Sequence, residues 1–173
     1  MLKKKFINKA VFLDRDGVIN YDYGYVHKIK DFKFKKNVFK AVKYLNKINY
    51  LVIVITNQSG IGRGYYKQKD LTILHNWMKK KFRQKGAYLN DIYHSPYYKF
   101  SKNEYSYKEK MRRKPNKGMI IEAKNKWLID IKNSFIVGDR TVDKKLAFNA
   151  KLKFIKVNPN SDLFKILTKN IKQ

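Results

Sequence analysis

The chain contains no cysteine among its 173 residues. Disulfide bonds, thiolate catalysis and zinc sites that need sulfur are therefore excluded. Long hydrophobic runs are also missing, since the longest aliphatic run, Leu51 to Ile55, falls far short of the roughly 18 residues of a membrane span. Proline and glycine are scarce, at 3 and 8 residues, while 43% of the residues are hydrophobic. This composition predicts a single globular domain over residues 1–173.

The N-terminal segment is basic but is not expected to direct secretion. Residues 1–5 include three lysines, as at the start of a signal peptide. The apolar stretch that follows is interrupted at once by Asp14, Arg15 and Asp16, so it is too short for a signal sequence. We therefore expect a cytoplasmic protein with no membrane partner.

Acidic residues are few, at 13 against 41 basic ones, which gives a net charge of +28. One explanation is an anionic partner such as nucleic acid. The other is compositional drift, because lysine supplies 35 of the basic residues and arginine only 6. Selection for phosphate recognition favours the bidentate fork of arginine. The lysines are also spread along the whole chain, so we favour drift and expect nucleic acid to bind no more than nonspecifically.

Strand and helix patterns alternate along the chain. Short apolar runs predict strands, and apolar residues at helical spacing predict amphipathic helices. The expected strands cover Lys9–Leu13, Leu51–Ile55, a short segment at Ile92–Tyr93, Phe135–Val137 and Phe154–Val157. The expected helices cover 38–45, 71–82, 119–127, a short segment at 146–150, and a last helix that Ser161 caps and that runs to Leu167. This alternation predicts an α/β fold, with a parallel sheet that has helices on both faces.

Polar motifs follow three of these strands. Ligands of such sheets bind beyond the carboxyl ends of the strands, where Asp14, Thr56 and Asp139 would meet. Asp14-Arg15-Asp16-Gly17 places two carboxylates after a buried strand, a pattern that suits Mg²⁺ and phosphoryl transfer but also suits a solvated Asp-Gly turn.

The other motifs are weak one by one. Thr56-Asn57-Gln58-Ser59-Gly60 could hold a phosphoryl oxygen or form an ordinary polar turn. Arg113-Lys114 could clamp a phosphate, although a pair of basic residues means little in so basic a chain. Gly138-Asp139-Arg140, with Asp143 close behind, could complete a metal site or cap a helix. Their order and common placement at one edge of the sheet favour a phosphoryl-transfer site.

With these motifs the chain resembles the haloacid dehalogenase (HAD) superfamily, from Val11 to about Val157. It is most similar to the group of histidinol-phosphate and heptose bisphosphate phosphatases. Residues 12–20 are typical of that group, and the Gly24-Tyr25-Val26-His27 segment and residues 56–64 look like the heptose enzymes. Arg140 stands where heptose enzymes tend to have lysine. The resemblance implies a HAD-like Rossmannoid fold with a minimal cap.

The resemblance also implies roles for individual residues. Asp14 would be the nucleophile that forms an aspartyl-phosphate, and Asp16 the general acid and base. Thr56 and Lys114 would stabilise the transferring phosphoryl group. Mg²⁺ would be held by the Asp14 carboxylate, the Asp16 backbone carbonyl and Asp139. The substrate pocket would be lined by Asp22, Tyr23, Gly24, Tyr25, Asn57, Gln58, Ser59, Arg113 and Arg140.

Many relatives bind a structural zinc ion in the loop before Arg113, through cysteine and histidine. The matching positions here hold Ser95, Tyr97, Lys110 and Arg112, so we expect no structural zinc. Packing among Tyr97, Tyr98, Phe100, Tyr105 and Tyr107 could order this loop instead; the alternative is a mobile loop and a weaker enzyme. Among the histidines, His27 could contact substrate or belong to a surface loop, while His75 and His94 are expected to be structural.

The resemblance therefore implies a Mg²⁺-dependent phosphatase, acting as a monomer, with a phosphorylated sugar as its substrate. The reaction would remove the C7 phosphate of D-glycero-D-manno-heptose 1,7-bisphosphate, in nucleotide-heptose biosynthesis for a surface polysaccharide. Histidinol phosphate is the alternative substrate. A nucleic-acid-binding or end-processing protein would explain the +28 charge, and a decayed enzyme is disfavoured by the intact Asp14, Asp16, Thr56, Lys114 and Asp139.

Overall fold

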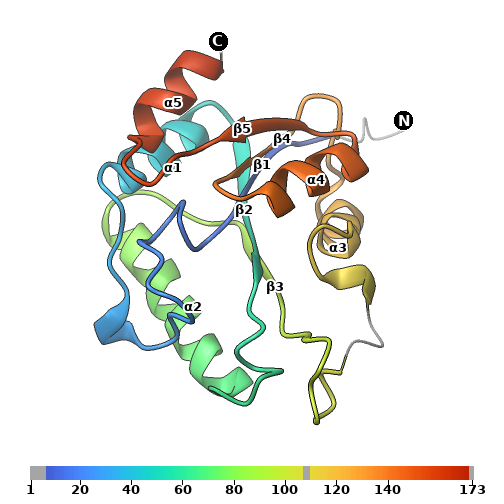
Figure 1. The fold of residues 1–173 in the computed structure, drawn as a ribbon. Helices are drawn as coiled ribbons and strands as arrows, with labels where there is room; N and C mark the ends of the chain where they lie inside the picture. The colour runs from blue at the N-terminus through green and yellow to red at the C-terminus, as the bar shows by residue number, and fades with distance from the viewer. Residues whose placement is uncertain (1–6, 107–109, 172–173) are drawn as a thin grey trace, which may run out of the picture.

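The fold is a parallel five-stranded sheet between two layers of helices, seen in a computed structural model that describes residues 7–106 and 110–171 (Figure 1). The strand order is β3-β2-β1-β4-β5. The strands are β1 (Lys9–Leu13), β2 (Tyr50–Asn57), β3 (Asp91–Ser95), β4 (Phe135–Gly138) and β5 (Lys153–Lys156). The helices are α1 (Val38–Lys47), α2 (Gln68–Gln84), α3 (Gly118–Trp127), α4 (Thr141–Ala150) and α5 (Leu163–Asn170), with short 3₁₀ turns η1 (Ile29–Asp31) and η2 (Lys110–Arg112).

Alternation along the central strands divides the core into two apolar layers. Val11 and Leu13 of β1 face one layer, which the buried sides of α1, α2 and α5 complete. Ala10 and Phe12 face the other layer, which α3 and α4 cover. In Figure 1 these two groups of helices lie on opposite sides of the sheet. The predicted α/β fold is thus confirmed, with β1 buried from Ala10 to Leu13 because it is covered on both faces.

Two helix starts differ from the sequence prediction. Helix α4 begins at Thr141 rather than near Leu146, because the Asp143 carboxylate accepts a hydrogen bond from the Arg140 backbone N–H and closes the first turn. Asp162, not Ser161, caps α5, since its side chain accepts from the backbone N–H groups of Phe164 and Lys165.

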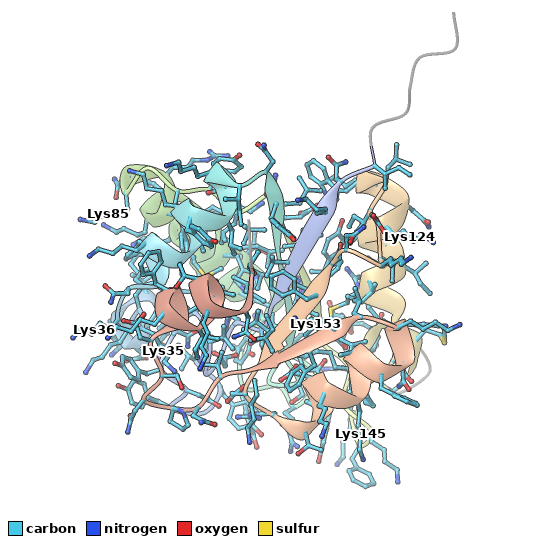
Figure 2. All side chains as sticks on the ribbon, turned by 90° about the horizontal axis from the view of Figure 1, so that it is seen from above. Lys35, Lys36, Lys85, Lys124, Lys145 and Lys153 are labelled. Carbon is cyan, nitrogen blue, oxygen red and sulfur yellow. The ribbon has the colours of Figure 1, made fainter. Side chains whose placement is uncertain are left out.

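The surface lysines are not gathered on one face. Figure 2 shows Lys36 and Lys85 on the side of α1 and α2, and Lys124, Lys145 and Lys153 around α3, α4 and β5. The labelled lysines thus lie over both helical layers, and compositional drift stays a prediction. No helix within residues 7–106 and 110–171 combines the length and hydropathy that a membrane span requires.

We expect Phe82→Ala to lower the free energy of unfolding by about 3–5 kcal/mol, because the Phe82 side chain is fully buried among Phe34, Phe39 and the α1 layer. Phe148→Ala is the matched control, since Phe148 is 85% exposed on α4. Urea denaturation of both variants measures the difference. Equal stability of the two variants would contradict the assignment of Phe82 to the core.

Candidate active site

The predicted site residues lie at the carboxyl edge of the sheet. Asp14 follows β1 directly and its backbone N–H donates to the Val137 carbonyl of β4 at 2.9 Å. Asp139 follows β4, and Thr56 is the penultimate residue of β2 rather than the first residue after it. Because β1 lies between β2 and β4, these three positions are brought side by side.

A cavity of about 490 Å³ opens at this edge. Its wall contains every predicted catalytic and substrate residue except Tyr23. Arg63, Tyr66 and Val142 also line it. Arg63 belongs to the segment 56–64 that resembles the heptose enzymes, but none of the three was predicted as a site residue. Tyr23 instead is 61% exposed, stacks on Tyr21 and lines a neighbouring hollow, so the structure does not place it with the other predicted residues.

A buried ion-pair cluster forms the floor of the site. The Lys114 ammonium lies 2.8 Å from Asp14 Oδ2 and 2.7 Å from Asp143 Oδ1, and its side chain is 1% exposed. Burial alone would lower the pKa of Lys114, but the charges of Asp14 and Asp143 outweigh it and raise the pKa. Burial, helped by the Asp143 charge, raises the pKa of Asp14, although Lys114 opposes this.

The same cluster suits a divalent cation. One oxygen from each of Asp14, Asp139 and Asp143 lies within 4.8 Å of the others. Three carboxylates meet there beside the Lys114 ammonium, and buried Asp139 Oδ1 has no hydrogen-bond partner among the described residues. Such hard oxygen donors are the ligands that Mg²⁺ prefers, and Asp14 and Asp139 are the two carboxylates that the sequence predicted for it.

Close packing of Asp139 explains Gly17. A Cβ atom at Gly17 would lie 2.2 Å from Asp139 Oδ2, and Gly17 has a φ of +84°. Both the left-handed backbone and the carboxylate contact therefore require glycine after Asp16.

The Asp16 carboxylate belongs to a separate hydrogen-bond network. It accepts from Arg15, from Asn20 Nδ2 at 2.9 Å and from Gln58 Nε2 at 2.9 Å. Burial would raise its pKa, but the Arg15 charge and these hydrogen bonds outweigh burial and lower it. The Asp16 side chain is thus held as a carboxylate and is not one of the three carboxylates of the Asp139 cluster. The metal contact through the Asp16 backbone carbonyl stays a prediction.

Gln58 connects this network to Thr56 and to Tyr66, which precedes α2. Its amide also donates to Thr56 Oγ1 at 2.9 Å, and its Oε1 accepts from the Tyr66 hydroxyl at 2.6 Å. The His27 ring stacks on Tyr66 with centroids 4.5 Å apart. His27 is not among the residues of the cavity wall, and it supports that wall through Tyr66.

Hydrogen bonds and an ion pair with other residues hold three basic residues of the pocket in place. Asn57 fixes Lys114, because its Oδ1 accepts from the Lys114 N–H at 3.0 Å and its Nδ2 donates to the Lys114 carbonyl at 3.1 Å. Arg113 Nη1 donates to the Tyr97 carbonyl at 2.9 Å. Arg140 forms an ion pair with Asp22, which joins the start of α4 to the loop between β1 and η1.

Two residues of this site carried little signal in the sequence. Asp143 was noted only for following Asp139, yet it is fully buried and pairs with Lys114. Lys35 resembled any other lysine, but it is 5% exposed and its ammonium donates to the Gly17 carbonyl at 2.9 Å. Burial lowers the pKa of Lys35, and the charge of Asp139 only partly offsets this. Its pairing across 18 residues has no local pattern that sequence reasoning could use.

Comparisons with known proteins assign this site to a family. Residues 11–163 match the family model described as polynucleotide kinase 3 phosphatase. A D-glycero-beta-D-manno-heptose-1,7-bisphosphate 7-phosphatase of Haemophilus influenzae is 42% identical over 147 residues, which cover 85% of this chain and 79% of the relative. A D-glycero-alpha-D-manno-heptose-1,7-bisphosphate 7-phosphatase of Campylobacter jejuni is 42% identical over 144 residues, covering 83% and 78%.

The chain belongs to this family of HAD-like phosphatases. Solved structures agree. D,D-heptose 1,7-bisphosphate phosphatase of B. bronchiseptica, complexed with magnesium and phosphate, has a TM-score of 0.77 at 25% identity, covering 94% of this chain and 87% of that one. A putative HAD-like phosphatase from Mesorhizobium loti has a TM-score of 0.80 at 30% identity, covering 84% and 70%.

The phosphatase loop before Arg113 makes aromatic contacts of the kind expected. Arg63 lies over the Tyr98 ring at 3.7 Å, the Tyr97 and Tyr105 rings meet edge to face, and Tyr105 packs against the small cluster of Ile61, Tyr66 and Leu71. Tyr98 contacts Phe100, which is 69% exposed, and Tyr107 lies outside the described residues.

At the four positions that match the zinc ligands of relatives, the side chains have other surroundings. Ser95 is fully buried at the end of β3, and Arg112 pairs with Glu122 at 3.0 Å. Tyr97 contacts Tyr105, and the Lys110 side chain lies outside the described part of the chain. The absence of a structural zinc stays a prediction.

For the metal site, we expect Asp139→Asn to weaken Mg²⁺ binding by roughly tenfold or more, because it removes a charged oxygen ligand beside Asp14. Isothermal titration with MgCl₂ in the absence of substrate measures this. Asp31→Asn is the control, since Asp31 is an exposed carboxylate of η1 outside the cluster. Unchanged affinity in Asp139→Asn would contradict the assigned cation site.

For the loop, we expect Tyr98→Ala to speed amide hydrogen exchange at Gly62, because the substitution removes the ring over which the neighbouring Arg63 guanidinium lies at 3.7 Å. The Gly62 N–H donates to the Pro96 carbonyl at 3.1 Å. Phe100→Ala removes a mostly exposed ring of the same loop and should leave that amide unchanged. Site-resolved exchange by NMR compares them. Fast Gly62 exchange in the unaltered protein would show that aromatic packing does not order the loop.

Proposed function

We propose that this phosphatase removes the C7 phosphate of D-glycero-D-manno-heptose 1,7-bisphosphate. The observation that carries the proposal is the buried Asp14–Lys114–Asp143 cluster below a basic cavity, in a chain 42% identical to phosphatases named for this substrate. Relatives are named for both the alpha and the beta anomer, so the proposal extends to either. The product would serve nucleotide-heptose biosynthesis for a surface polysaccharide.

In the proposed reaction, Asp14 attacks phosphorus and the bond to the sugar oxygen breaks. The attacking carboxylate lies at the cavity floor, next to Lys114, whose charge would neutralise the phosphoryl oxygens as they approach. The Thr56 hydroxyl, also in the cavity wall, would donate to the same group. Mg²⁺ bound by Asp14 and Asp139 would supply further charge neutralisation.

Asp16 is assigned the proton transfers. It would protonate the leaving sugar oxygen and later take a proton from the water that hydrolyses the aspartyl-phosphate. Because its pKa is lowered, Asp16 is ionised in the substrate-free site and can accept a proton. A phosphate dianion bound beside it would raise that pKa and so favour the acid form for the first step.

The pocket rim supports a substrate with a second negative group. Arg63, Arg113 and Arg140 line the cavity together with the polar side chains of Asn57 and Ser59. A sugar that carries two phosphates offers these arginines a second anionic group, whereas histidinol phosphate offers them an amine. Charge complementarity thus favours the bisphosphate.

A second candidate is a phosphatase acting on a nucleic-acid end. Two observations favour it, namely the polynucleotide 3 phosphatase description of the matching family model and the net charge of +28. The composition weighs against it, because lysine supplies 35 of the 41 basic residues whereas selection for phosphate recognition favours arginine.

Phosphate release from heptose 1,7-bisphosphate, histidinol phosphate and a 3′-phosphorylated oligonucleotide tests both candidates. We expect Mg²⁺-dependent release from the heptose substrate, abolished by chelator and lowered at least roughly 10³-fold by Asp14→Asn, because the nucleophile is lost. Asp31→Asn should keep full activity.

Preference for histidinol phosphate or for the oligonucleotide would overturn the assigned substrate and keep the site. Undiminished release in Asp14→Asn would overturn the nucleophile.

A further inference from the structure

Arg15 is a fully buried charge that lies between the two aspartates of the first motif. Its guanidinium holds the Asp16 carboxylate with Nη2 at 2.9 Å from Oδ1 and 3.0 Å from Oδ2, and with Nε at 3.2 Å from Oδ1. The same Nη2 donates to the Val26 carbonyl at 2.6 Å. The orientation of the Asp16 carboxylate therefore depends on the plane of the Arg15 guanidinium.

His75 contacts the other terminal nitrogen of the Arg15 guanidinium, Nη1. It projects from α2, is 7% exposed, and its Nε2 lies 3.3 Å from Arg15 Nη1. A guanidinium can only donate hydrogen bonds, so His75 must accept through an unprotonated Nε2. Burial, followed by the charges of Arg15 and other basic neighbours, holds the pKa of His75 well below its usual value, so the ring is neutral and able to accept.

His75 is not part of the cavity wall that Asp14, Asp16 and Lys114 form. It cannot be expected to touch the substrate, and any influence on the reaction must pass through Arg15. Its ring in turn faces His94, with centroids 5.8 Å apart, and His94 Nε2 lies 3.0 Å from Gln68 Oε1. A chain of contacts thus runs from α2 and β3 to the carboxylate at the cavity.

We propose that His75 is a positioning residue of the phosphatase, which sets the Arg15 guanidinium so that Asp16 is aimed at the leaving oxygen of the substrate. The inference rests on the proposed role of Asp16 as general acid. In that step an oxygen of Asp14 bonds to phosphorus, the bond from phosphorus to the sugar oxygen breaks, and the proton of Asp16 passes to that oxygen. Without the acceptor at His75, one charged N–H of a buried guanidinium loses its partner and the guanidinium can turn away.

The choice of leaving group separates positioning from a purely structural role. A sugar alkoxide needs the proton of Asp16 to depart, whereas p-nitrophenolate departs from p-nitrophenyl phosphate without one. A wrongly oriented Asp16 carboxyl group therefore lowers the rate of release from the sugar phosphate but not from p-nitrophenyl phosphate. A general loss of structure slows both.

The experiment compares His75→Met with His75→Gln. The two side chains have the same length, but only glutamine carries an oxygen that can accept from Arg15. The measured quantity is the rate of leaving-group release in the first turnover, which excludes the later hydrolysis step. Rates are normalised to the folded fraction from thermal unfolding, and His75→Leu serves as a second acceptor-free variant where the methionine variant folds poorly.

For His75→Met we expect sugar release to fall about tenfold, a part of the roughly 10²–10⁴-fold that general acid catalysis supplies, while p-nitrophenol release stays within about threefold. His75→Gln should restore both rates. Equal loss on both substrates, no loss on either, or no rescue by glutamine would overturn the positioning role.

Asp16→Asn distinguishes failure of this inference from failure of the proposed function. If Asp16→Asn slows sugar release selectively and His75→Met does not, the inference alone is wrong. If Asp16→Asn affects the two leaving groups equally, the assigned acid role fails and the inference fails with it. If the wild type does not hydrolyse heptose bisphosphate, the comparison is made on the sugar phosphate that it does hydrolyse, and either outcome again decides the role of His75.

Discussion

The buried ion pairs of Lys114 hold the functional end of this phosphatase together. One ammonium joins Asp14, which follows β1, to Asp143 of α4, and Asn57 at the end of β2 fixes the backbone of the same lysine. Removing a single partner would leave a charge uncompensated in a dry environment, an arrangement that costs several kcal/mol. The loop that carries Lys114, the start of α4 and the ends of two strands are thereby fixed together before any ligand binds.

A second set of interactions does the same for Asp16. Its carboxylate accepts hydrogen bonds from Arg15, Asn20 and Gln58. The Tyr66 hydroxyl donates to Gln58, and the His27 ring stacks on Tyr66. The two aspartates of the motif are only two residues apart, yet one faces an ammonium and other carboxylates while the other faces a guanidinium and amides. These surroundings move the two pKa values in opposite directions, up for Asp14 and down for Asp16. Such separation is what distinct roles for neighbouring carboxylates require.

Much of the fold followed from local pattern. The run from Leu51 to Ile55 had to be a buried strand, and the alternation of strands with helices implied the parallel sheet and its ligand-binding edge. Helix starts set by the hydrogen bonds of one side chain were harder to predict: Asp162 capped α5 in place of its neighbour Ser161, and Asp143 extended α4 by several residues. Lys35 and His75 acquire their roles only from contacts across 18 and 60 residues. No spacing rule in one sequence identifies such partners, whereas Asp14, Thr56 and Asp139 were visible because each lies at or next to a strand end.

The excess of lysine also bears on the solution behaviour of the protein. A net charge of +28 makes the compact state repel itself, and dissolved ions screen that repulsion over a Debye length of about 8 Å at physiological ionic strength. The folded chain thus depends on its counterions. Polyvalent anions such as phosphate would gather near it without a specific site, so the salt content of its surroundings sets how tightly the fold is held.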